Sequence, residues 1–147
     1  MGGSGSTSEP DSDGNDLNSL GSNSDPYLDP SNLENSTARS YAIKMENSIE
    51  DHLTPDDLRG AWRDLHEDPV PDPNKPGEFY QHLNEVNNAL SSCRNAIEKF
   101  TELLKDPSLS SRDRSIIQSL LSRASKTMDY VEKVLNRDQW FPGVRVP

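Results

Sequence analysis

The sequence has few cysteines, few apolar residues and few basic residues, and each shortage excludes a class of protein. Cys93 is the only cysteine among 147 residues. The chain therefore has neither an intramolecular disulfide nor a metal site built from several cysteines. Only 31% of the residues are apolar, and no run approaches the length of a membrane span. The N-terminus also lacks the apolar stretch of a secretory signal, so we expect any export to depend on a larger parent chain.

Motifs that hold metals or phosphates are missing as well. The sequence contains no His-Glu-x-x-His and no glycine-rich phosphate loop. The 15 Lys and Arg residues are outnumbered by 25 Asp and Glu residues, which gives a net charge of −10. Non-specific binding to DNA needs a broad basic surface, so this balance argues against a DNA-directed nuclease. We expect neither a metal nor a cofactor.

Small and polar residues are concentrated in the first 40 positions. There, 28 residues are Ser, Gly, Asn, Asp or Pro, and seven are apolar. Such a segment buries too little apolar surface to offset the conformational entropy that folding removes. Residues 1–50 also hold nine acids and two bases. We expect residues 1–40 to form a disordered acidic linker and residues 41–147 to form the folded domain.

Apolar periodicity from Tyr41 onward predicts an all-α fold, a small bundle of about four helices. Steps of three and four residues indicate two short helices, near 41–53 and 55–65, and two long antiparallel helices, near 79–104 and 111–135. Thr54, as N-cap before Pro55, predicts the start of the second helix. Ser110 and Asp113 predict a capping box. Four prolines between residues 67 and 77 predict an exposed loop.

Among three histidines, His82 is the one followed by an acid at helical spacing, Glu85. If a helix begins at Phe79, both side chains lie at the rim of its apolar face, where a half-buried acid and base could meet a substrate. A surface ion pair without catalytic function is the alternative. His52 and His66 have no acid on the same helical face. In that regular helix Tyr80 points away from His82.

Several segments together resemble the C-terminal toxin domain of contact-dependent growth-inhibition proteins, the all-helical type 28 class of bacterial polymorphic toxins. They are Asp57–Asp64, Pro69–Pro71, Gly77–Glu85, Asn88–Leu90 and Arg94–Asn95. The opening Gly2–Ser6 also resembles the linker that precedes this domain. The resemblance implies a ribonuclease that cleaves transfer RNA, carried on a larger secreted or cell-surface parent and active in the cytoplasm of the target cell. It also implies a cognate immunity protein.

The resemblance further implies catalytic residues at Asp57, Tyr80, His82 and Glu85. The chain departs from the family at Tyr80, where a characterised member has Trp, although Tyr keeps an aromatic face on which a base could stack. It departs again at its last residues. That member ends in Gly-Tyr-Gly-Ile, which docks into the target cell's cysteine synthase, whereas this chain reads Phe-Pro-Gly-Val-Arg-Val-Pro147. We therefore do not expect a cysteine synthase partner.

The residues fit this chemistry and leave alternatives open. RNA is cleaved when its 2′-hydroxyl loses a proton and the leaving 5′-oxygen gains one, and His and carboxylate groups can serve these roles. Arg94, about 13 Å of helical rise beyond Glu85, is a candidate for positioning the RNA substrate. Asp57 is either a helix-capping acid or a catalytic residue. The alternative for the whole chain is a non-catalytic helical interaction module.

Overall fold

The computed structural model describes residues 27–147. It contains a short 3₁₀ helix and four α-helices: η1 (Pro30–Asn32), α2 (Ser36–His52), α3 (Pro55–Leu65), α4 (His82–Leu103) and α5 (Ser111–Leu135). Between residues 27 and 147 the β-type pairing is limited to one isolated bridge, from Pro71 to Phe79. The predicted all-α bundle of about four helices is confirmed.

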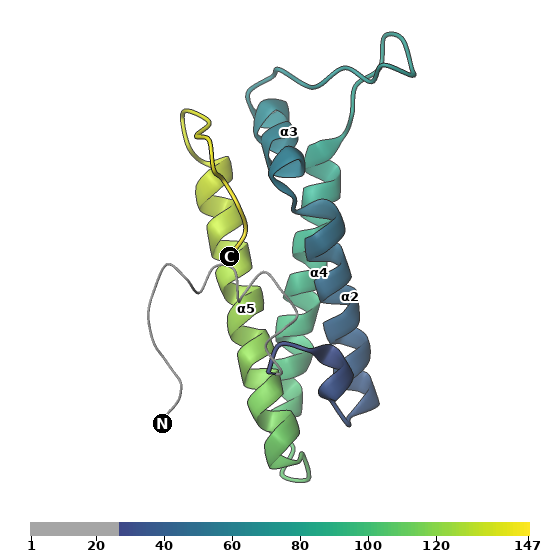
Figure 1. The fold of residues 1–147 in the computed structure, drawn as a ribbon, viewed down its shortest axis with the longest axis vertical. Coiled ribbons are helices and arrows are strands. Elements are labelled where there is room, and N and C mark those ends of the chain that lie inside the picture. Colours follow the sequence, from purple (N-terminus) through teal and green to yellow (C-terminus); the bar gives the residue numbers. More distant parts are fainter. Residues whose placement is uncertain (1–26) are drawn as a thin grey trace.

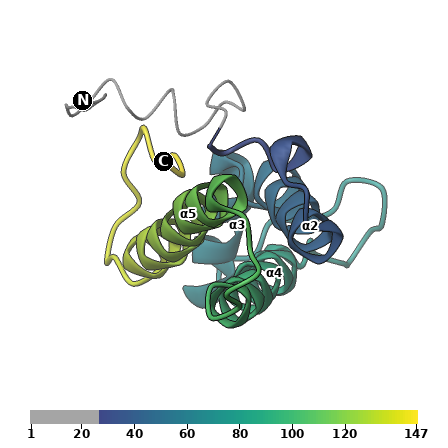
Figure 2. The same cartoon turned by 90° about the horizontal axis from the view of Figure 1, so that it is seen from below.

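The helices form one bundle around a shared core. Helices α4 and α5 run antiparallel, α2 lies beside α4, and α3 crosses one end of the bundle (Figure 1). Seen along the bundle, α2, α4 and α5 surround a common interior (Figure 2). Their periodic apolar positions fill it, as amphipathic helices require. The largest fully buried side chains are Phe100, Met45, Leu58, Ile116, Ile117 and Leu120. None of the helices in the described part of the chain is long and apolar enough to cross a membrane.

The folded part begins before residue 41. Helix α2 starts at Ser36, and Leu28 and Leu33, ahead of it, are buried in the core. The Asp113 carboxylate of α5 accepts the backbone N–H groups of Glu34 and Asn35 at 2.9 and 2.8 Å. A distant acid therefore fixes a segment whose own composition predicts disorder. The remainder of the expected linker, residues 1–26, lies outside the described residues.

Helix α4 begins at His82 and not at the expected Phe79. The proline-rich loop supplies an extended partner: Tyr80 donates its N–H to the Val70 carbonyl at 2.9 Å, and Phe79 bridges to Pro71. Phe79 is consequently 52% exposed and lies outside the core stripe where the periodicity placed it. The loop that carries these residues projects from the same end of the bundle as α3 (Figure 1).

The predicted caps are confirmed at α3 and half confirmed at α5. At α3, Thr54 and Asp57 form a complete capping box. At α5, the Ser110 hydroxyl accepts the Asp113 N–H at 3.0 Å, but the Asp113 carboxylate points to the start of α2 and does not return to Ser110. The same side chain therefore joins two elements that the sequence pattern treats separately.

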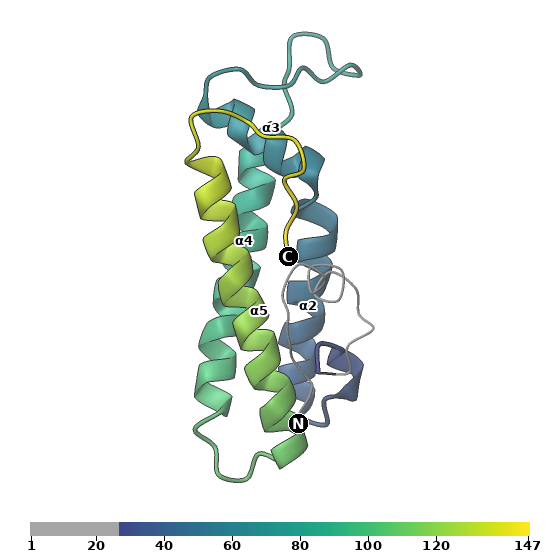
Figure 3. The same cartoon turned by 60° about the vertical axis from the view of Figure 1, so that its left-hand side comes forward.

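The residues after α5 turn back along the bundle (Figure 3). The Trp62 indole of α3 donates to the Arg137 carbonyl at 2.9 Å, and its ring lies 6.1 Å from that of Trp140. Further on, Val144 is buried and the Arg145 N–H donates to the Tyr130 hydroxyl at 2.8 Å. This last segment therefore connects α3 to the end of α5.

Candidate active site

The sequence-predicted residues meet where α2 ends, α3 begins and α4 begins. His82 is the first residue of α4, and Asp57 lies in the first turn of α3. His82 Nδ1 lies 3.7 Å from Asp57 Oδ1, and the two side chains are 18% and 16% exposed. This distance is an ion-pair contact and slightly longer than a hydrogen bond. His82 Nδ1 has no hydrogen-bond partner among the described residues, so a small movement of the ring would complete a bond to Asp57.

Asp57 uses its two carboxylate oxygens differently. Oδ2 accepts the Thr54 hydroxyl at 2.8 Å and the Thr54 N–H at 3.3 Å, as the capping box requires. Oδ1 faces His82. The sequence leaves capping and catalysis as alternatives for this residue, whereas the geometry permits both at once. The cap fixes the carboxylate, and the fixed carboxylate sets the direction in which the imidazole can point.

Gly60 makes room for the His82 ring. It lies in the middle of α3 and is buried. A Cβ placed on Gly60 would lie 2.8 Å from His82 Nε2 and would overlap Cγ and Cδ2 of the ring. Glycine in a helix interior costs about 1 kcal/mol relative to alanine, so its presence there has a packing reason. The sequence contains a sign of this packing, because an isolated glycine inside an amphipathic helix indicates that another group packs close to the helix backbone.

Tyr80 lies beside His82, contrary to the expectation from a regular helix. The two ring centroids are 5.3 Å apart and the rings are tilted by 47°. Because α4 begins at His82, the helical wheel that separates the two side chains does not apply to Tyr80. Tyr80 is 37% exposed and lines a cleft of about 280 Å³. An aromatic face at the edge of a cleft can stack against a base.

The same cleft contains Asp64. Asp64 Oδ2 accepts the Leu83 N–H at 2.9 Å and so caps α4 from α3, since the N-cap residue Gln81 makes no such side-chain bond in the described structure. Asp64 Oδ1 is buried, and it finds no hydrogen-bond partner among residues 27–147. The carboxylate fixes the first turn of α4, and with it the position of His82.

Glu85 has a different partner from the expected one. Its Oε1 lies 3.6 Å from Nδ1 of His52, the last residue of α2, while His82 faces Asp57. The expected pair of His82 with Glu85 is therefore replaced by two pairs, His82 with Asp57 and Glu85 with His52, and each pair joins two helices. The His52 and Glu85 side chains are 44% and 48% exposed. Helical spacing does not reveal His52 as a member of a pair, because its partner Glu85 lies on another helix.

Arg94 does not lie next to these pairs. It is exposed on α4, twelve residues after His82, which corresponds to about 18 Å of helical rise. It can reach only a part of a ligand that extends well beyond His82. In the described part of the chain, no group of three or more His, Cys, Asp or Glu side chains is arranged to hold a metal ion.

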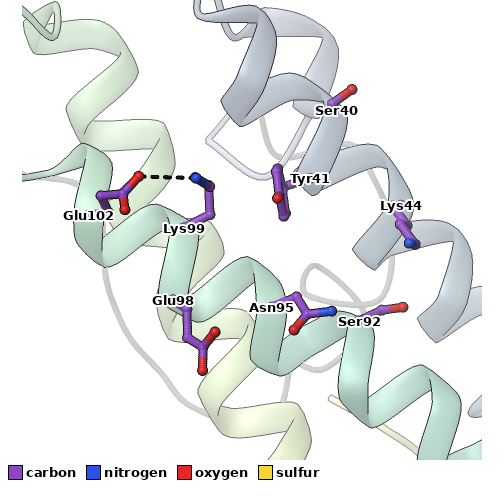
Figure 4. Close-up of a pocket in the computed structure, with 8 residues that line it drawn as sticks. All are labelled: Ser40, Tyr41, Lys44, Ser92, Asn95, Glu98, Lys99 and Glu102. Carbon is purple, nitrogen blue, oxygen red and sulfur yellow. Dashed lines mark hydrogen bonds and ion pairs between the residues drawn. The ribbon is translucent and has the colours of Figure 1, made fainter.

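A polar groove of about 510 Å³ runs between α2 and α4, further along the bundle. Figure 4 shows side chains from both helices around it, with the Lys99 ammonium close to the Tyr41 ring. That ammonium lies 5.7 Å from the ring centroid and 3.0 Å from the Glu102 carboxylate. The charges of the groove are balanced, since Lys44 and Lys99 are matched by Glu98 and Glu102. It therefore has no net attraction for a polyanion.

Comparison with known proteins places the chain in a family. The model of bacterial toxin 28, Ntox28, matches residues 34–137. The chain belongs to the bacterial toxin 28 family. No curated protein and no solved structure gave a match. The match spans all four α-helices, so Asp57, Tyr80, His82 and Glu85 all lie inside the toxin domain. It also begins seven residues before Tyr41, in agreement with the early start of the fold.

Proposed function

We propose that this toxin domain is a metal-independent ribonuclease that cleaves transfer RNA by attack of a 2′-hydroxyl on the adjacent phosphate. The observation that supports it best is the pairing of His82 with Asp57, half-buried and held by a capping box. An imidazole fixed by a carboxylate through Nδ1 can exchange a proton with a substrate through Nε2. Membership of a toxin family and the resemblance to tRNA-cleaving members agree with this reaction.

In this proposal the other residues bind or orient the RNA. Tyr80, beside His82 and partly exposed, stacks on a base next to the cut. Arg94 contacts a phosphate further along the strand, because it is too distant for the reacting one. Glu85 assists proton transfer at the exposed side of the site. The required 2′-hydroxyl excludes DNA as a substrate of this reaction.

The family also suggests how the domain is delivered and restrained. We propose that it forms part of a larger secreted parent and acts in the cytoplasm of a target cell. A producing cell needs a neutralising partner, and an immunity protein that covers the His82 face would block RNA directly. Hydrogen exchange on the complex should then show protection around residues 77–94. Protection confined to α5 would contradict this position of the partner.

Substitution of His82 tests the proposed function. His82→Ala should keep the helical circular dichroism of the native domain and lose RNA cleavage by a factor of a thousand or more, because the fixed imidazole is gone. His66→Ala is the matched control. His66 stacks on Trp62, with ring centroids 4.0 Å apart, and its Nδ1 lies 2.8 Å from the Trp62 carbonyl oxygen. A folded His82→Ala variant that still cleaves RNA would refute the proposal.

A further inference from the structure

Cleavage of RNA by its 2′-hydroxyl needs two proton transfers, and the His82–Asp57 pair supplies one. A base removes the proton of the 2′-hydroxyl, the oxygen attacks phosphorus, and the bond from phosphorus to the 5′-oxygen breaks. The departing 5′-oxygen takes a proton from an acid, which leaves a cyclic phosphate and a free 5′-hydroxyl. One group gains a proton and another loses one, so the step balances with two acid–base groups of opposite protonation.

We propose that His52, held by Glu85, is the second acid–base group of this site. The inference rests on the proposed ribonuclease function and deepens it. His52 Nδ1 faces the Glu85 carboxylate at 3.6 Å, as His82 Nδ1 faces that of Asp57 at 3.7 Å. In each pair the carboxylate occupies the Nδ1 side of the ring. In each ring Nε2 is therefore the nitrogen that does not face the carboxylate, and in this proposal it exchanges the proton, as where a carboxylate orients an acid–base histidine.

The two pairs are anchored one helical turn apart. His82 and Glu85 are residues i and i+3 of α4, whose Cβ atoms in a helix are separated by about 5–6 Å. His52 reaches Glu85 from the end of α2, and the chain then passes through Leu53 and Thr54 into α3, which carries Asp57. In this proposal the two imidazoles, whose pairs share neighbouring turns of α4, act on the same phosphate.

The exposure of the second pair suits a group that meets substrate. The His52 side chain is 44% exposed and stands at the end of an open groove of about 470 Å³ along α2. Lys44 and Asp51 of the same helix line this groove, and Glu85 approaches from α4. The groove leaves the His52 side chain open to an approaching strand, and its charges, Lys44 against Asp51, are balanced.

This assignment gives Glu85 a positioning role. Its Oε1 lies on the Nδ1 side of the His52 ring at 3.6 Å, so the carboxylate can fix the direction of the imidazole. Histidine is the side chain most often used for proton transfer in enzymes. Glu85 therefore contributes by orienting His52, and His52 exchanges the proton.

A sulfur-substituted substrate tests the proposal. The native bond cut by the wild-type chain is first mapped in transfer RNA, and the corresponding stem-loop is then made with oxygen or with sulfur at the bridging 5′ position. A thiolate, whose conjugate thiol has a pKa of about 8.5, leaves without taking a proton. His52→Ala and His82→Ala are compared on both substrates in the full chain, with His66→Ala as control.

We expect both site variants to lose at least a hundredfold on the oxygen substrate and only one of them to recover on the sulfur substrate. The variant that recovers has lost the acid. A His52→Ala variant that cleaves as well as His66→Ala would overturn the proposal, as would recovery of both site variants or of neither. If His52→Ala does not fold, His52→Gln replaces it, since the amide can still contact Glu85. A wild-type chain that cuts neither substrate would instead contradict the proposed function itself.

The Glu85→Gln variant tests whether Glu85 orients His52 for the reaction or only stabilises the fold. It should lower kcat at least tenfold with KM unchanged, and it should cause no further loss when combined with His52→Ala, because the two residues act as one unit. Independent, multiplicative losses would show that Glu85 does not act through His52.

Discussion

Asp57 shows how one side chain joins the stability of this domain to its proposed chemistry. Oδ2 closes the capping box at the start of α3 and Oδ1 faces His82. The neighbouring Asp56 lies in the same first turn and is exposed. Both acids interact favourably with the positive end of the helix dipole, but only Asp57 has His82 as a partner.

The difference between these two acids gives a prediction. Asp57→Asn should lower the free energy of unfolding by about 0.5–1 kcal/mol and lower the cleavage rate a hundredfold or more, because the neutral amide no longer fixes the orientation of the His82 imidazole. Asp56→Asn removes the same charge and should change the rate less than threefold. Urea unfolding and cleavage are measured at a temperature where both variants are folded. A rate loss that only follows unfolding would reduce Asp57 to a cap.

At this scale the sequence predicts some residues of the site and misses others for a physical reason. His82 stands out by its spacing to Glu85, Asp57 and Tyr80 follow from the resemblance to the toxin family, and the structure brings the three side chains together. The partner of Glu85 is not recognisable, because His52 is 33 positions away and arrives on another helix. Gly60 leaves a visible trace as a glycine inside a helix, but only the fold shows that the His82 ring fills the space.

Among the elements, acids of one helix fix the start of another. Asp64 of α3 caps α4 through the Leu83 N–H. Asp113 of α5 binds the N–H groups of Glu34 and Asn35, just before α2, and the Asn35 side chain is the N-cap of α2 itself. Apolar periodicity predicts the existence and type of all four α-helices because it reflects the face that each buries. It places the starts of α2 and α4 wrongly. The start of α4 depends on tertiary contacts, and that of α2 depends on the polar N-cap Asn35 together with the contact to Asp113, neither of which contributes to apolar periodicity.

The contact of Asp113 with the segment before α2 predicts a large effect of a single carboxylate. Asp113 is 2% exposed, so Asp113→Ala leaves two backbone N–H groups without their charged acceptor and should lower the free energy of unfolding by about 2–3 kcal/mol. Asp106→Ala is the control. It removes an exposed acid whose side chain bonds to nearby Ser108, and should cost clearly less than Asp113→Ala. Urea denaturation compares the two, and equal losses would contradict the role of Asp113 in holding the segment before α2.

In the whole molecule, the three main helices meet around a buried polar group. Glu46 of α2 and Arg123 of α5 form an ion pair at 2.7 Å whose side chains are 4% and 5% exposed. Burial raises the pKa of Glu46 above its ordinary value, although Arg123 acts in the opposite direction. Cys93 of α4 is also buried here, and desolvation, helped by the charge of Glu46, raises the pKa of its thiol to about 11. None of these groups belongs to the candidate site.

The raised pKa of Cys93 predicts how the whole domain responds to alkali. The thiol ionises near its ordinary value of 9.0 in the unfolded chain and near 11 in the folded one, so its stabilising contribution is complete below pH 9 and is lost as the pH rises toward 11. Between pH 8 and 10.5 the wild-type chain should lose about 2 kcal/mol more unfolding free energy than Cys93→Ala. Urea unfolding at the two pH values measures this difference. Equal losses in the two proteins would show that the thiol does not titrate in this way.

The central claim is that this toxin domain cleaves RNA through its own acid–base side chains. The most direct measurement incubates the full chain with total transfer RNA in excess EDTA and identifies the ends of the products. We expect discrete fragments that carry a 2′,3′-cyclic phosphate and a 5′-hydroxyl, made at the same rate with and without the chelator. Intact RNA in EDTA with cleavage restored by added magnesium, or fragments that carry a 5′-phosphate, would contradict it.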